Sequence, residues 1–138
     1  MLDELTADVQ VLRRDARDAR LAPVQSLAIS SEQYKGTKSG AEIAPSRDGR
    51  FIYVEDRGEN TLVGYRADAD TGELSLLQRL PSGGDKPWGF AIDPSGRWML
   101  VANAAKVSLF AVDEATGGLS EAGQSVDSAT PLSIASMP

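Results

Sequence analysis

The residues that this chain lacks narrow the chemistry that it can perform. Its 138 residues include no cysteine and no histidine. Without cysteine it forms no disulfide, no thiolate nucleophile and no Cys-ligated metal site. Without histidine it supplies no imidazole base, no Ser-His pair and no His-ligated zinc. Any general base must therefore be a carboxylate, a lysine, a tyrosine or a water molecule, and we expect neither a metal nor another cofactor.

One acidic side chain, Glu42, interrupts an otherwise apolar run. Its neighbours are Ala41, Ile43 and Ala44. Titratable groups in apolar surroundings cluster in the clefts where catalysis takes place, which makes Glu42 a candidate catalytic base. The alternative is a charge at the end of a strand that points into solvent.

A candidate catalytic cation follows in the segment Glu55-Asp56-Arg57-Gly58. Arg57 can bind an anion or polarise a carbonyl, because its guanidinium presents five N–H donors in a planar fork. The alternative is a turn arginine that pairs with Asp56 or Glu55, a common surface arrangement that contributes little energy.

The composition is that of a globular domain. The chain is 41% hydrophobic and 25% charged, with a net charge of -6. The negative sign argues against nucleic acid and anionic membranes as partners. The first residues lack the basic start and apolar run of a signal peptide, and no apolar stretch approaches the roughly 20 residues of a membrane span. We therefore expect a cytoplasmic location.

The chain repeats itself, and the repeat predicts the elements that hold these candidates. The segment at 41–50 aligns with 90–97, each ending in Gly-Arg, and an apolar run follows in both copies. The Thr-Gly pair at 71–72 returns at 116–117. Each copy contains four short β-branched and aromatic segments separated by turn signals. Four strands in about 45 residues is the size of one blade of a β-propeller.

The predicted fold is therefore all-β, a partial β-propeller of about two and a half four-stranded antiparallel blades. We expect the charged segment 13–20 to form a hairpin between two strands. The whole chain, 1–138, is taken as one partial propeller domain. Its predicted parts are the second half of a blade (1–29), a loop (30–40), a blade (41–80), a blade (87–125) and the first strand of a further blade (131–138).

Several segments of the sequence resemble the lactonase family. Its members are seven-bladed propellers and include bacterial 6-phosphogluconolactonases. The resemblance covers nearly the whole chain and corresponds to the last two-fifths or so of a family member. The matching residues are Asp3-Glu4-Leu5, Tyr34-Lys35-Gly36, Gly40-Ala41-Glu42-Ile43, Asp48-Gly49-Arg50-Phe51-Ile52-Tyr53-Val54, Asp56-Arg57-Gly58, Gly83-Gly84-Asp85-Lys86-Pro87 and Asp93-Pro94-Ser95-Gly96-Arg97.

The resemblance implies roles for particular residues. Glu42 would act as base or orienting group and Arg57 as anion contact, near one mouth of the central channel. Lys86 and Trp88 would contact the substrate. Two positions depart from the family pattern: Trp88 stands where the family usually has arginine, and Ala44 where it often has histidine. A tryptophan carries no charge and offers a single N–H donor, so these departures weaken the catalytic interpretation.

The function that the resemblance implies is hydrolysis of a small sugar-phosphate lactone, in the pentose phosphate route. One alternative is a truncated, non-catalytic propeller segment that binds a partner or supports structure. A second is a lactonising enzyme similar to the muconate-cyclising branch of the family. Because unpaired strand edges invite pairing with other chains, we also expect self-association through open blade edges.

Overall fold

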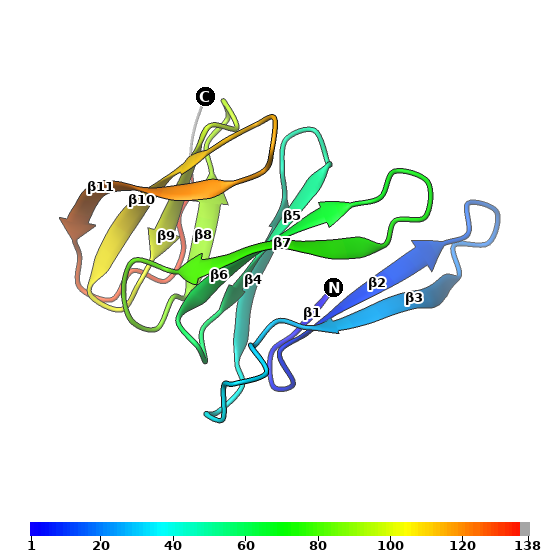
Figure 1. Ribbon diagram of the computed structural model, residues 1–138, viewed down its shortest axis with the longest axis horizontal. Helices are drawn as coiled ribbons and strands as arrows, with labels where there is room; N and C mark the ends of the chain where they lie inside the picture. The colour runs from blue at the N-terminus through cyan, green and yellow to red at the C-terminus, as the bar shows by residue number, and fades with distance from the viewer. Residues whose placement is uncertain (136–138) are drawn as a thin grey trace.

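Residues 1–135 are described in a computed structural model and form three antiparallel sheets (Figure 1). The first sheet has the order β1-β2-β3, the second β4-β5-β6-β7 and the third β8-β9-β10-β11. Their strands are β1 (Leu2–Asp3), β2 (Asp8–Arg14), β3 (Leu21–Ala28), β4 (Gly40–Pro45), β5 (Phe51–Asp56), β6 (Thr61–Ala67), β7 (Leu74–Pro81), β8 (Gly89–Ile92), β9 (Trp98–Ala102), β10 (Lys106–Val112) and β11 (Leu119–Asp127).

The turns join neighbouring strands in sequence order, as the repeat predicts. Gly49 and Gly96 occupy equivalent turns between the first two strands of their sheets, with φ angles of 73° and 79°. Glycine adopts this left-handed region without the clash that a Cβ would cause. The segment 15–20 connects β2 to β3, so the predicted charged hairpin is confirmed.

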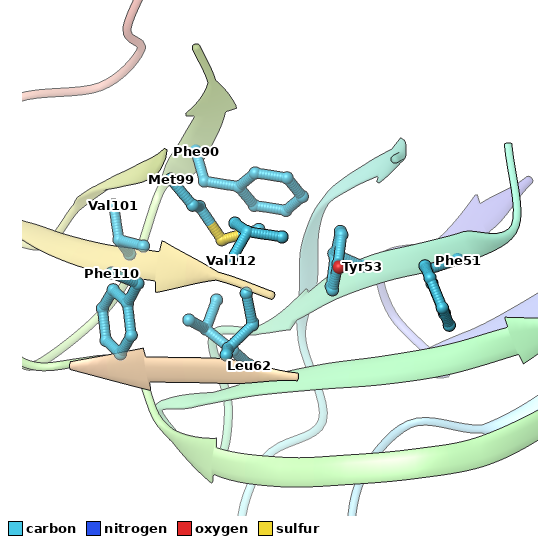
Figure 2. Close-up of a cluster of buried hydrophobic side chains, with 9 residues drawn as sticks. Phe51, Tyr53, Leu62, Phe90, Met99, Val101, Phe110 and Val112 are labelled. Carbon is cyan, nitrogen blue, oxygen red and sulfur yellow. The ribbon is translucent and has the colours of Figure 1, made fainter. Parts of the chain in front are cut away.

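The sheets stack face to face, with an apolar layer in each of the two interfaces. Figure 2 shows Phe90, Met99 and Val112 of the third sheet close to Tyr53 and Leu62 of the second. A separate buried cluster fills the interface between the first and second sheets; it comprises Ala7, Val9, Ile29, Val54, Val63, Tyr65 and Leu74. One three-stranded and two four-stranded antiparallel sheets, stacked in sequence order, define a partial β-propeller, as predicted.

A glutamine on the outer strand of one sheet forms hydrogen bonds to the outer strand of the next sheet. The Gln78 amide accepts a hydrogen bond from the Leu119 N–H and donates one to the Leu119 carbonyl, both at 2.8 Å. Gln25 makes the same pair of bonds to Leu74, at 2.8 and 3.0 Å. These bonds fix the outer edges of successive sheets relative to each other.

The first strand of each complete sheet lies at the inner edge of the stack, where β4 contacts β8. Residues 131–135 form no strand, although a strand is predicted over 131–138; the last three residues lie outside the described part. A strand requires a ladder of backbone pairing. The Leu132 carbonyl instead passes 3.1 Å from the point where a Cβ on Gly89 would lie. Within residues 1–135, no helix is long and apolar enough to cross a membrane.

Candidate functional site

Three of the four residues singled out in the sequence line one pocket. Glu42, Arg57 and Trp88 come from β4, the turn after β5, and the segment before β8, and they surround a hollow of about 240 Å³. The other lining residues are Leu2, Glu4, Gly40, Ala41 and Ile43. The pocket therefore opens at the inner strands of the stack, and all three sheets or the segments next to them contribute lining residues.

Arg57 is held firmly in this pocket. Its Nε donates to Ser39 Oγ at 3.1 Å, and its Nη2 donates to the same oxygen at 2.7 Å and to Glu4 Oε1 at 2.5 Å. Its side chain is only 20% exposed. The surface alternative, in which Arg57 pairs with Asp56 or Glu55, is not seen in the described residues. Bonds to two different groups orient the guanidinium at the wall of the pocket.

Trp88 covers one face of that guanidinium. The Arg57 Cζ lies 4.5 Å from the centroid of the Trp88 ring. A cation at this distance is attracted by the electron-rich face of an indole. Trp88 carries no charge of its own, so Arg57 is the cation that this stack contributes to the pocket.

Glu42 is half-buried at the start of β4, and one of its oxygens is already occupied. Its Oε1 accepts a hydrogen bond from the Ile43 N–H at 3.0 Å. Its Oε2 faces β8, at 3.8 Å from the position of a Cβ on Gly89. The side chain therefore faces the gap between two inner strands and is only partly exposed to solvent.

Lys86 does not join the other three. It is exposed, it is not among the residues that line the pocket, and its backbone N–H donates to Asn60 Oδ1 at 2.7 Å. Its φ angle of 48° belongs to a tight turn. A contact between Lys86 and a substrate remains a prediction.

Glu55 is a functional candidate that the sequence reasoning missed. It is completely buried, and neither of its carboxyl oxygens has a hydrogen-bond partner in the described part of the chain. Burial first, and the negative charge of Glu42 second, raise the pKa of Glu55 to about 8, while the positive charge of Arg57 opposes the rise. A signal was present in the sequence, since Glu55 occupies the same face of its strand as Phe51 and Tyr53, where an apolar residue is expected.

The fold and the pocket together define a partial β-propeller with a carboxylate and a fixed arginine at its inner strands. The chain belongs to the seven-bladed β-propeller lactonase family, whose model matches residues 1–136. It is 38% identical over 108 residues to a 6-phosphogluconolactonase of Formosa agariphila, covering 75% of this chain and 30% of that protein. It is 24% identical to the 6-phosphogluconolactonase of Bacillus subtilis, covering 97% of this chain and 39% of that protein.

Solved structures show the same similarity. A periplasmic gluconolactonase of Pseudomonas aeruginosa superimposes with a TM-score of 0.86 and 31% identity, covering 93% of this chain and 36% of that chain. A protein from Lactobacillus plantarum gives a TM-score of 0.91 and 30% identity, covering 96% and 39%. The chain thus spans less than two-fifths of the length of these relatives.

Proposed function

We propose that this chain carries part of the active site of a lactone hydrolase similar to 6-phosphogluconolactonases. The observation that carries the proposal is the meeting of Glu42 and Arg57 in one pocket at the inner strands. A carboxylate that accepts a proton and a cation that stabilises an oxyanion are the two groups that ester hydrolysis requires.

The proposed reaction opens the lactone ring by attack of water. Glu42 removes a proton from the water as its oxygen bonds to the lactone carbonyl carbon. The carbonyl oxygen becomes an oxyanion, and Arg57 offers it the N–H groups of Nη1. The ring C–O bond then breaks as the carbonyl re-forms, and the departing alkoxide takes up the proton that Glu42 had received. Atoms and charge balance without a cofactor.

The substrate of this proposal is a small aldonolactone, with the phosphorylated form suggested by the relatives. The muconate-cyclising alternative is a different reaction, in which a carboxylate adds to a carbon–carbon double bond. No feature of the described pocket favours it. For location, the cytoplasm remains our proposal, although the similar Pseudomonas protein is described as periplasmic.

The test is 6-phosphogluconolactone hydrolysis, measured above the spontaneous rate, with Glu42→Gln and Arg57→Met compared with the unchanged chain. We expect Glu42→Gln to lower kcat by about 10²-fold or more, because the amide cannot accept the proton. Glu73→Gln is the matched control, since Glu73 is exposed in a distant turn and should leave the rate unchanged.

Two results would speak against the proposal. A Glu42→Gln rate equal to that of the unchanged chain would remove Glu42 from the mechanism. The absence of any turnover by the unchanged chain would favour the non-catalytic alternative, in which the pocket is a remnant of the family's site or binds another partner.

A further inference from the structure

Ser39 is half-buried beside the pocket, does not line it, and binds the Arg57 side chain at two points. Its Oγ accepts one hydrogen bond from the Arg57 Nε at 3.1 Å and another from Nη2 at 2.7 Å. These two nitrogens belong to one rigid plane, because the guanidinium is delocalised. Two bonds to a single oxygen therefore set the direction in which the whole group points.

The backbone around Ser39 is fixed independently of its hydroxyl group. The Ser39 carbonyl accepts a hydrogen bond from the Gly58 N–H at 3.1 Å, and the Tyr34 hydroxyl donates to the Gly58 carbonyl at 2.6 Å. A Cβ on Gly58 would lie 2.5 Å from the Thr37 carbonyl oxygen and 3.0 Å from the Ser39 nitrogen. The loop that carries Ser39 and the turn that carries Arg57 thus pack backbone against backbone, which holds the Ser39 oxygen at a constant place.

The other two contacts of Arg57 constrain it differently. The Glu4 side chain accepts a bond from Nη2 but is 60% exposed, and exposed ion pairs are held weakly. The Trp88 ring attracts the cation without fixing where its N–H groups point. Ser39 is an uncharged acceptor, so it directs the guanidinium and leaves its positive charge intact.

We propose that Ser39 is a positioning residue for Arg57, whose hydroxyl oxygen holds the guanidinium in the orientation that meets the oxyanion of the lactone. This inference rests on the proposed hydrolytic role of Arg57. It extends the candidate site to the loop that joins the first sheet to the second.

The variants Ser39→Ala and Ser39→Thr separate orientation from packing. Alanine removes the acceptor oxygen, whereas threonine keeps it. Arg57 meets charge that develops in the transition state, so Ser39→Ala should lower kcat for 6-phosphogluconolactone by about tenfold with little change in KM. Ser39→Thr should retain kcat within about threefold. Ser75→Ala makes the same change at an exposed site on β7 and should leave kcat unchanged.

Nitrogen-15 NMR of the same chains follows the hydrogen bonds to Ser39 without any turnover. The Arg57 Nε–H signal is assigned by its loss in Arg57→Met. Exchange of this proton with water should accelerate by about tenfold in Ser39→Ala, because its acceptor is gone. Ser39→Thr and Ser75→Ala should leave the exchange rate unchanged.

Failure of this inference and failure of the proposed function give different results. If the unchanged chain opens no lactone, the proposed function fails, and the NMR comparison alone decides whether Ser39 orients Arg57. If the chain is active, equal kcat values for Ser39→Ala and the unchanged chain would overturn the inference, as would equal losses in Ser39→Ala and Ser39→Thr. In either case, an Nε–H exchange rate that Ser39→Ala leaves unchanged would overturn it.

Discussion

Glu55 and the aspartates of the hairpin turns are acids in opposite environments. Asp68 accepts hydrogen bonds from the N–H groups of Thr71 and Asp70, at 2.8 and 3.0 Å, and these bonds lower its pKa. Asp113 makes the equivalent bonds to Thr116 and Ala115, with the same effect on its pKa. Glu55 has no such donors and is buried, so its pKa rises. The turn aspartates therefore stabilise the fold when ionised, whereas Glu55 destabilises it when ionised.

This contrast predicts how stability depends on pH. Folded Glu55 keeps its proton up to about pH 8, whereas the unfolded chain loses it near the ordinary value of 4.5. Between these values the folded state binds more protons, so the free energy of unfolding should fall as the pH rises from about 4.5 to 8. The decrease is at most about 5 kcal/mol. The contribution of the turn aspartates is instead lost as the pH falls below their ordinary range.

Urea unfolding at a series of pH values tests this prediction. Glu55→Gln should flatten the decline between pH 5 and 8, because the amide does not titrate, whereas the exposed control Glu73→Gln should keep it. A decline of equal slope in Glu55→Gln and the unchanged chain would assign the pH dependence to other groups.

The sequence predicted most of the site but not its buried acid. Glu42 was recognisable as a charge in an apolar run, and Arg57 and Trp88 as positions of a family pattern. The environment of Glu55 depends on the β4 bulge and on the neighbouring sheet, and neither is encoded within its own segment. In the sequence it therefore resembled an ordinary partner of a turn arginine.

At the scale of elements, the glutamine bonds join outer strands that have no backbone ladder between them. Gln78 satisfies both backbone groups of Leu119, the first residue of β11. Gln124 occupies β11 but is exposed, and its side chain makes no hydrogen bond within the described residues. Gln78 and Gln124 therefore allow the same substitution to be made inside an interface between sheets and outside it.

We expect Gln78→Ala to lower the free energy of unfolding by about 1–3 kcal/mol, because it leaves two partly buried backbone groups without partners. Gln124→Ala should change it by no more than about 0.5 kcal/mol, as is usual for an exposed site. Thermal and urea unfolding of the two variants provide the comparison. Equal losses would show that Gln78 acts through strand propensity and not through the bonds to Leu119.

The repeat predicted the sheets because turn residues and apolar runs recur at the same places in each copy. It could not predict β1. This strand has only two residues, and it pairs with only the first two residues of β2, so no recurring pattern marks it in the sequence. Nor could it predict that residues 131–135 lack strand pairing, since pairing depends on a neighbour in space. The family pattern on which the prediction rests specifies residue types. It does not specify which strand edges pair with a neighbouring strand.

At the scale of the whole molecule, one face of the third sheet is as apolar as an interface but is uncovered. Leu100 and Val107 occupy the places of Tyr53 and Leu62, which are fully buried between the second and third sheets. With Leu109 and the 70% exposed Val126, they line a hollow of about 180 Å³. Contiguous apolar surface of this kind marks a site of association.

We therefore expect the 138-residue chain to self-associate through this face, with a sedimentation coefficient that rises with protein concentration. Val126→Lys places a charge in the patch and should shift the chain toward monomer, because burying an unpaired ammonium is costly. Leu76→Lys is the matched control, since Leu76 is exposed at 58% on β7, outside this face. A chain that stays monomeric at all concentrations would contradict the prediction. Equal effects of the two substitutions would also contradict it, because the added charge, and not its position in this face, would then explain the loss of association.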